Sequence, residues 1–126
     1  MYNPDNSKFT KSHEWIASDG TVGISDHAQK EITDVVFVEL PKIGKEVKAG
    51  EPVAVVESVK AAFDIYAPVS GKIQSINSDV AKNPAIVNQS PYEKGWLYKI
   101  AKANPTEENA LMSHAQYQDF LKSEEH

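Results

Sequence analysis

The chain has 126 residues, of which 40% are hydrophobic and 25% charged, as is usual for a single globular domain. Its 13 basic residues are all lysines, and 18 acidic residues bring the net charge to −5. This balance argues against nucleic acid or an anionic membrane as a partner, because both need a basic surface. The chain has no cysteine, which excludes disulfides, thiolate metal sites and a cysteine nucleophile.

Targeting segments are not indicated by the sequence. The start, Met1-Tyr2-Asn3-Pro4, does not begin a secretory signal, and a chain without arginine is unlike a transit peptide. No apolar run approaches the roughly 18 residues of a membrane-spanning helix. We therefore expect a cytoplasmic protein of bacterial type, with a processed form in the mitochondrial matrix as the lesser option.

The first third of the chain predicts short strands around one short helix. Strands are expected at residues 14–17, 21–24 and 35–40. The dipeptide Asp19-Gly20 is a strong turn signal between the first two of these strands. Ser25 or Asp26 fits a helix N-cap, which predicts a short helix over residues 26–32.

Two β-prone segments in the middle of the chain predict a hairpin. Residues 53–56 and 63–66 are rich in valine, isoleucine and aromatic residues, which suit a half-buried pleated surface. The segment between them lacks the Asn-Gly or Gly-Gly pair of primed turns, so we expect a type I turn over residues 58–61. This turn places Lys60 at the hairpin tip. An exposed turn lysine is, by itself, most often a plain solvated charge.

The remaining segments predict an antiparallel β architecture. Turn-rich residues 47–52 and 67–73 lead into and out of the hairpin, which suits two similar halves around a pseudo-twofold axis. Residues 78–92 are expected to be mostly loop with one helical turn. A strand over 96–101 and a helix over about 106–123 follow. Many short strands with glycine and proline between them indicate a mainly β fold with small α additions, a compact barrel or sandwich.

Other chemical sites have weak signals. Four histidines are scattered along the sequence, at positions 13, 27, 114 and 126. No two of them form a helical ligand pair, so no metal site is predicted. Ser25-Asp26-His27 has the composition of a catalytic triad, but consecutive residues of a short helix cannot adopt its geometry, and a helix cap is the better interpretation.

The residues around Lys60 carry a resemblance to a known family. The segment Glu57-Ser58-Val59-Lys60-Ala61 resembles the attachment site of lipoyl carrier domains, and the longer string VESVKAAFDIYAPVSG resembles the H-protein family of the glycine cleavage system. Further blocks match this family in order: Ser12–Trp15, Gly23–Gln29, Val36–Pro41 and Asn88–Trp96. These blocks extend from about Phe9 to Trp96, so the resemblance covers most of the chain.

The resemblance implies a fold and a cofactor. The fold would be a compact antiparallel barrel-sandwich hybrid with a lipoyl hairpin, formed as one domain over residues 1–126. Lys60 would carry lipoic acid on its ε-amino group, as N6-lipoyllysine. Glu57 and Gly71 would help a lipoyl-attaching ligase or transferase to recognise the hairpin.

The resemblance also implies partners. The family is a carrier that performs no catalysis of its own. A pyridoxal-phosphate glycine decarboxylase places an aminomethyl group on the lipoyl arm, and a tetrahydrofolate-dependent aminomethyltransferase removes it. A flavin-containing dihydrolipoamide dehydrogenase then reoxidises the dithiol with NAD.

In this family the loaded arm folds into a surface cleft. Carried over to this sequence, the cleft would use Ser12, Glu14 and Asp64, with His13 nearby. Without the resemblance, Glu14 and Asp64 would be interpreted as solvated strand carboxylates. Carboxylates suit the cleft because the amine on a loaded arm is a cation at neutral pH. Phe63 replaces a small polar residue of many relatives, and it either narrows the cleft or packs on its rim.

Alternative functions remain open from the sequence. An H-like protein that relays lipoyl groups to other complexes would have the same attachment site. A lipoyl domain of a 2-oxoacid dehydrogenase usually shows D-K-A, and a biotin domain M-K-M, where this chain has Val59-Lys60-Ala61. An enzyme that uses Lys60 in a Schiff base would need a desolvated amine, which a hairpin tip beside Glu57 and Asp64 does not offer.

Overall fold

The structure is a computed structural model that describes residue 3 and residues 6–124. Residues 1–2, 4–5 and 125–126 lie outside the described residues. The predictions that involve Met1, Tyr2, Pro4 and His126 therefore stay predictions. In the part of the chain that is described, no helix combines the length and apolar character needed to cross a membrane.

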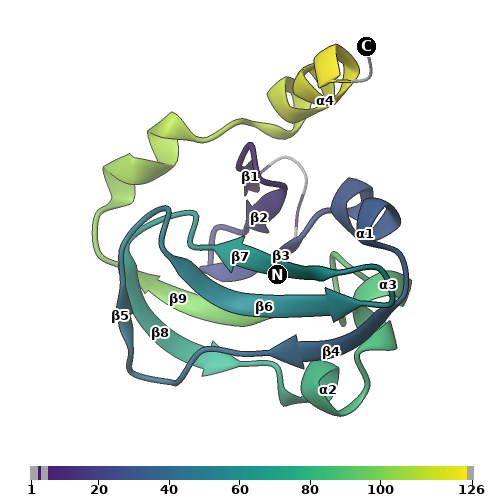
Figure 1. Ribbon diagram of the computed structural model, residues 1–126. Helices are drawn as coiled ribbons and strands as arrows, with labels where there is room; N and C mark the ends of the chain where they lie inside the picture. Colours follow the sequence, from purple (N-terminus) through teal and green to yellow (C-terminus); the bar gives the residue numbers. More distant parts are fainter. Residues whose placement is uncertain (1–2, 4–5, 125–126) are drawn as a thin grey trace.

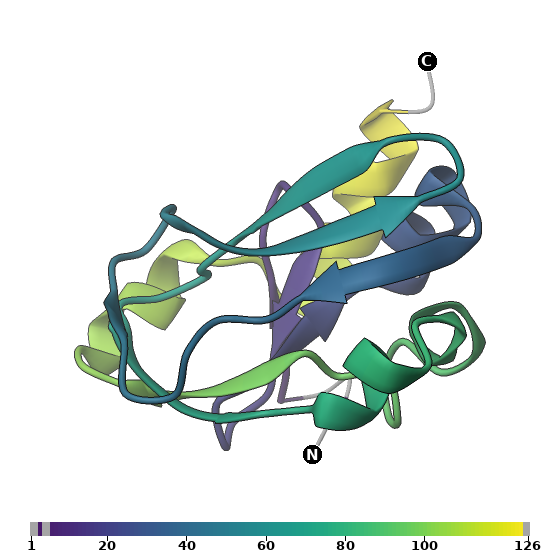
Figure 2. The same cartoon turned by 60° about the horizontal axis from the view of Figure 1, so that its bottom comes forward.

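In the described part of the chain, nine strands form two antiparallel sheets that lie over each other (Figures 1 and 2). One sheet has six strands in the order β1-β2-β3-β9-β8-β5, and the other has three in the order β4-β6-β7. Their bounds are β1 Lys8–Phe9, β2 Glu14–Ile16, β3 Thr21–Ile24, β4 Val35–Glu39, β5 Glu46–Val47, β6 Pro52–Ser58, β7 Ala62–Tyr66, β8 Gly71–Ile76 and β9 Tyr98–Lys102. The predicted mainly β, antiparallel fold is confirmed, although the sheets do not close into a barrel.

The main hydrophobic core joins the two sheets. Buried Val22, Ile73 and Ile100 of the larger sheet belong to the same cluster as Val56 and Ile65 of the smaller one. In β8 the side chains alternate between buried and exposed at its start, as expected when one face of a strand covers a core. Burial of these branched side chains is the principal stabilising contribution, at about 25 cal/mol per Å² of apolar surface.

The short helix α1, Asp26–Ile32, agrees with the sequence prediction (Figure 1). Ser25 is its N-cap, and the Ser25 hydroxyl accepts a hydrogen bond from the backbone N–H of Ala28 at 3.1 Å. Such a cap satisfies a backbone donor that the first helical turn would otherwise leave unpaired. The cap therefore fixes where α1 begins.

The prediction that residues 78–92 are mostly loop was wrong. This segment contains two helices, α2 at Ser78–Lys82 and α3 at Ala85–Gln89. Pro84 suggested a break, but it stands at the N-cap of α3, where a missing backbone N–H leaves no helical hydrogen bond unmade. The side chain of Asn77 caps α2 by accepting from the Asp79 N–H.

The C-terminal helix is present but divided, so the predicted continuous span over 106–123 is corrected. A 3-10 helix covers Pro105–Ala110, and α4 covers His114–Glu124. Between them Met112 pairs with Phe9: each backbone N–H donates to the other residue's carbonyl, at 2.8 and 2.9 Å. This bridge holds the chain extended there. Tyr117 of α4 then stacks on Phe9, with ring centroids 4.5 Å apart, in a second core cluster.

Candidate functional site

Lys60 lies at the tip of the β6–β7 hairpin, as predicted. The strands pair up to Glu57 and Ala62, and the Ser58 N–H donates to the Ala61 carbonyl at 2.9 Å. The Ser58 hydroxyl accepts from the backbone N–H groups of Lys60 and Ala61, at 3.1 and 3.3 Å. No residue of this loop has a positive φ, which excludes the primed turn types and agrees with the expected type I turn.

Two contacts join the tip to its surroundings, and its side chains remain exposed. The Val59 N–H donates to the Asp34 carbonyl at 3.0 Å, and Lys60 Nζ lies 3.5 Å from the Glu31 carbonyl at the end of α1. The side chain of Val59 is nevertheless 70% exposed, and that of Lys60 is exposed. A group attached to Lys60 would therefore project into solvent from a rigid backbone.

A cavity of about 550 Å³ opens beside Lys60, between the hairpin and α1. Its lining includes Lys60 itself and three of the residues expected in the cleft, Ser12, His13 and Asp64. Ser12 and Asp64 are exposed, and His13 is half-buried. The apolar part of the lining comprises Ile24, Ala28, Ile32, Ala61, Ala62, Phe63 and Ile65. The structure thus brings four separated segments of the sequence to one concave surface.

Phe63 is part of the lining and is half-buried. It also packs against the main core cluster, so its ring serves both the core and the cavity wall.

Glu14 takes a position that the sequence did not indicate. It does not line the cavity, and only 1% of its surface is exposed. Glu14 Oε1 accepts hydrogen bonds from the hydroxyls of Thr10, at 2.6 Å, and Ser12, at 2.5 Å, while Oε2 accepts from the Tyr66 N–H at 3.2 Å. Because Ser12 and Tyr66 both line the cavity, Glu14 joins two of its walls.

The charge of Glu14 also affects Tyr98. Burial is the main reason that the pKa of Tyr98 is raised far above its usual value, and the nearby Glu14 carboxylate adds to the effect. The phenol is consequently neutral at any physiological pH. Glu14 therefore belongs to the packed interior beside the cavity rather than to its solvated surface.

Glu57 and Gly71, the two residues expected to guide lipoyl attachment, lie in different places. Glu57 is half-buried in β6, opposite Phe37 and Ala62. Gly71 begins β8, and the start of β8 lies at the end of the sheets remote from the β6–β7 turn (Figure 1). A Cβ atom at Gly71 would lie 2.2 Å from the Ala101 carbonyl oxygen. This glycine is thus required by the close approach of β8 and β9.

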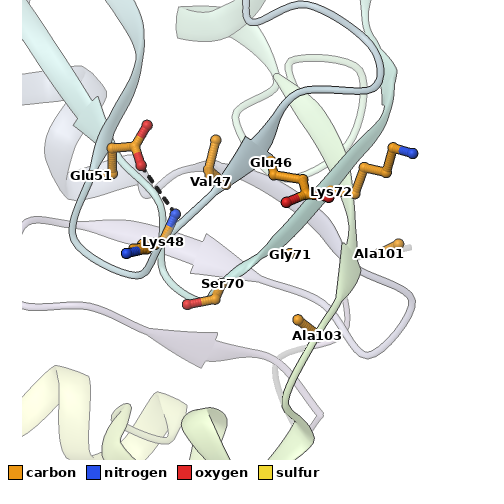
Figure 3. Close-up of a pocket in the computed structure, with 9 residues that line it drawn as sticks. All are labelled: Glu46, Val47, Lys48, Glu51, Ser70, Gly71, Lys72, Ala101 and Ala103. Carbon is orange, nitrogen blue, oxygen red and sulfur yellow. Dashed lines mark hydrogen bonds between the residues drawn. The ribbon is translucent and has the colours of Figure 1, made fainter.

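Gly71 also borders a second concave surface of about 510 Å³. Figure 3 shows its lining from β5, β8, β9 and the loops beside them. In the loop after β5, the Lys48 N–H donates a hydrogen bond to Glu51 Oε1 at 3.2 Å. This surface contains none of the other predicted site residues.

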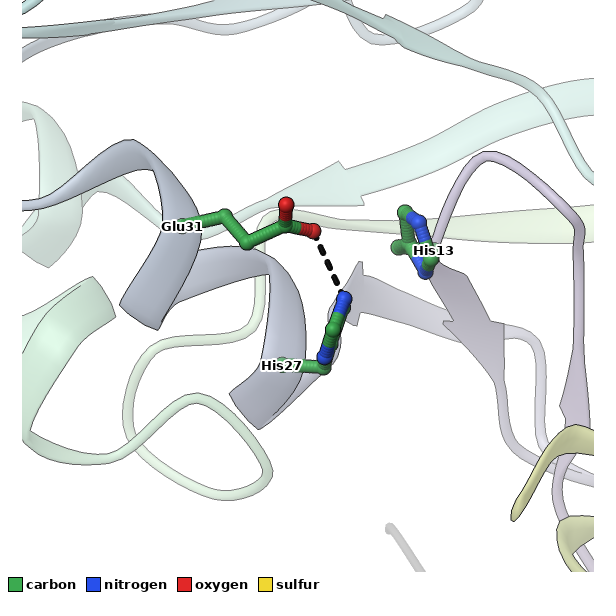
Figure 4. A group of neighbouring side chains, drawn as sticks. All are labelled: His13, His27 and Glu31. Atoms are coloured by element: carbon green, nitrogen blue, oxygen red, sulfur yellow. Dashed lines mark ion pairs between the residues drawn. The ribbon is translucent and has the colours of Figure 1, made fainter. Parts of the chain in front are cut away.

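No two histidines form a helical pair in the sequence, yet the structure brings two of them together. The rings of His13 and His27 lie 4.9 Å apart between centroids, and His27 Nε2 lies 2.6 Å from Glu31 Oε1 (Figure 4). The i,i+4 spacing of His27 and Glu31 on the predicted helix was the available signal for that pair. The approach of His13 depends on the packing of β2 beside α1, which the sequence does not reveal.

The chain is similar to known proteins over nearly its whole length. A family model described as glycine cleavage H-protein matches residues 7–124. The glycine cleavage system H protein of Deinococcus radiodurans is 57% identical over 115 residues, covering 91% of this chain and 93% of the relative. That of Legionella pneumophila (strain Corby) is 53% identical over 120 residues, covering 93% and 96%.

A solved structure gives the same answer for the fold. The crystal structure of a glycine cleavage system H protein from Mycobacterium marinum aligns with a TM-score of 0.85 at 32% identity, covering 98% of this chain and 100% of that one. Sequence and fold agree over nearly the whole chain. The chain belongs to the glycine cleavage H-protein family.

Proposed function

We propose that this protein is the lipoylated carrier of a glycine cleavage system and that it performs no catalysis itself. The observation that carries the proposal is the position of Lys60, exposed at a rigid hairpin tip and directly beside a cavity that it also lines. Family membership supports the same role. The rival carrier functions are not favoured, because relatives matched over nearly their full length are named as glycine cleavage system H proteins.

The cavity fits a lipoyl arm in size and in chemistry. A lysine side chain extended by lipoic acid reaches about 14 Å, from roughly a dozen bonds of ordinary covalent length. Ile24, Ile32 and Phe63 offer apolar contacts to the methylene chain, and Ser12 and Asp64 offer polar contacts. When bound to Lys60, the lipoyl group would supply a redox-active dithiol that can also hold the aminomethyl group. The protein would supply attachment, positioning and shelter.

Asp64 would be the principal partner of the amine on a loaded arm. Its carboxylate is exposed on β7 and lines the cavity, so it is available to a cation there. The Ser12 hydroxyl lies on the same cavity but already donates to Glu14. Glu14 would therefore act by holding Ser12 and the end of β7 in place, whereas Asp64 would act directly.

Recognition by the lipoyl-attaching ligase or transferase would depend on the shape of the hairpin and on Glu57. Glu57 lies three residues before Lys60 and is partly accessible. Gly71 is distant from the tip, so its contribution would come through the packing of β8 on β9. The expected partners are thus a lipoyl-attaching enzyme, glycine decarboxylase, aminomethyltransferase and dihydrolipoamide dehydrogenase. The cytoplasmic location expected from the sequence stays a prediction.

A reconstituted assay tests this function. Lipoylated protein is combined with a bacterial glycine decarboxylase, aminomethyltransferase and dihydrolipoamide dehydrogenase, and glycine- and tetrahydrofolate-dependent formation of NADH is followed. We expect the rate to depend on the lipoylated chain and to be absent with its unlipoylated form. A lipoylated chain that supports no NADH formation, but acts in a 2-oxoacid dehydrogenase complex, would contradict the proposal.

A further inference from the structure

His13, His27 and Glu31 form a cluster at the edge of the cavity beside Lys60. The proposed carrier function gives none of the three a chemical role, although His13 and Glu31 line the cavity. One potential ligand atom from each residue lies within 4.8 Å of the other two (Figure 4). Among the residues that the structure describes, this is the group of histidine and carboxylate side chains gathered tightly enough to hold a metal ion. The three residues come from the loop before β2 and from one face of α1.

The donor atoms indicate which metal would fit. Two imidazole nitrogens and one carboxylate oxygen are a common ligand set of zinc, with the fourth tetrahedral position left to water. Magnesium and calcium instead prefer sites made of oxygen ligands. The cluster therefore favours zinc or a similar transition-metal cation.

The distances are close to those that zinc requires. Two ligand bonds of roughly 2.0–2.1 Å at a tetrahedral angle separate the ligand atoms by about 3.3 Å. The contact between His27 and Glu31, at 2.6 Å, would have to open slightly, and the other separations, all within 4.8 Å, would have to close by at most about 1.5 Å. The Glu31 side chain is 60% exposed and that of His27 30% exposed, so both can turn without disturbing the core.

The surroundings already orient His13. Its backbone has a φ of 75°, which is uncommon for a residue with a side chain, and two backbone hydrogen bonds hold it there. His13 Nδ1 lies 2.8 Å from the Tyr117 hydroxyl, which in turn lies 2.7 Å from the Ser25 hydroxyl. Metal-bound histidines commonly direct their other ring nitrogen to such a partner, which fixes the orientation of the ring. With Nδ1 directed to Tyr117, the site would use Nε2 of His13.

We propose that His13, His27 and Glu31 form a zinc-binding site at the edge of the cavity lined by Lys60. The simpler interpretation is an ordinary i,i+4 pair between His27 and Glu31, with His13 packed beside it. The two interpretations differ in one respect: only the zinc site requires all three side chains together.

The experiment titrates zinc into unlipoylated protein from cells that lack lipoate, so that no dithiol competes for the metal. Isothermal titration calorimetry measures the affinity and stoichiometry, and the visible absorption of added cobalt reports tetrahedral geometry. We expect one equivalent of zinc to bind. Glu31→Gln and His27→Ala should each weaken binding by at least about tenfold. Tyr117→Phe removes the hydroxyl that contacts both His13 and Ser25, and it should weaken binding by about tenfold.

His114→Ala is the matched control, because His114 lies on α4 and is not a member of the cluster. Thermal unfolding monitors the fold of each variant, and the exposed Glu31→Gln change leaves the core intact. Absence of zinc binding by the parent protein would overturn the proposal, as would binding that the His27 and Glu31 substitutions weaken no more than the His114 substitution does. Because the protein carries no lipoyl group here, either result leaves the carrier function unaffected.

Discussion

The tip of the Lys60 hairpin lines the cavity, whereas the buried Glu14 lies behind its walls, and the protein packs the two in opposite ways. At the tip Val59 is 70% exposed. The loop is fixed mainly by hydrogen bonds from its backbone N–H groups to the Ser58 hydroxyl and the Asp34 carbonyl. Glu14 is 1% exposed, and its carboxylate accepts three hydrogen bonds.

This difference indicates which residues can be substituted without loss of stability. An attachment point that must enter the active sites of several enzymes has to protrude, so it contributes little to the folded state. A site that receives the arm between encounters has to keep its shape, which requires buried and fully bonded groups. Substitutions at the tip should therefore alter function alone, whereas substitutions at Glu14 or Gly71 should alter stability first.

The largest effect on stability is expected at Gly71. Gly71→Ala would place a Cβ atom 2.2 Å from the Ala101 carbonyl oxygen, so β8 and β9 would have to separate, at a cost of about 3 kcal/mol. Gly44→Ala is the control: it has no atom within 4 Å of the added Cβ and only a positive φ of 91°, worth about 1 kcal/mol. Urea denaturation measures both. If both variants lose the same free energy of unfolding and Gly71→Ala is lipoylated more slowly, the ligase contacts this glycine directly.

A smaller loss is expected when Glu14 is removed. Glu14→Ala leaves the Thr10 and Ser12 hydroxyls and the Tyr66 N–H without their acceptor, which should lower the free energy of unfolding by about 2–3 kcal/mol. Asp64→Ala, on the exposed side of the same cavity, should change it by less than about 0.5 kcal/mol. If chemical denaturation gives the two variants equal stability, the buried Glu14 carboxylate does not stabilise the fold more than the exposed Asp64 carboxylate does.

Asp64 should instead affect the lifetime of the loaded arm. A charge-assisted contact with the amine would be worth on the order of 1.5 kcal/mol, so Asp64→Ala should make the isolated aminomethylated protein decay about tenfold faster. Asp119→Ala, an exposed substitution on α4 outside the cavity lining, should decay at the parent rate. Mass spectrometry at fixed pH follows the decay. Identical lifetimes for all three proteins would show that the arm does not dock against Asp64.

The smallest effect is expected at Glu57. Glu57→Ala should slow lipoylation by a purified ligase several-fold, while stability changes by less than about 0.5 kcal/mol because the carboxylate is partly exposed. Glu46→Ala removes the same charge from β5, at the other end of the sheets, and should leave the modification rate unchanged. Equal rates for Glu57→Ala and the parent would restrict ligase recognition to the shape of the hairpin.

Local signals predicted much of this fold, and long-range packing limited the rest. Residues 26–32 form the expected helix because Ser25 caps it locally, and two β-prone segments placed the hairpin correctly. The division of the C-terminal helix escaped prediction because it depends on Met112 pairing with Phe9, more than a hundred residues earlier.

Prediction of the cavity from the sequence was limited in the same way. Family motifs indicated Ser12, His13 and Asp64, and all three line it. The burial of Glu14 could not be read from its strand, because β7 supplies one of its hydrogen-bond donors. The meeting of His13 with His27 likewise depends on how β2 and α1 lie together in space.

The most direct test of the account is a map of lipoylation on this chain. The protein is modified by a purified lipoyl ligase, digested, and analysed by mass spectrometry, beside a Lys60→Arg variant that keeps the positive charge. We predict one lipoyl group, on Lys60 and on none of the other twelve lysines, and none on the variant, whose unfolding free energy should stay within about 0.5 kcal/mol of the parent. A lipoyl group on another lysine, or an unmodified Lys60, would contradict the account.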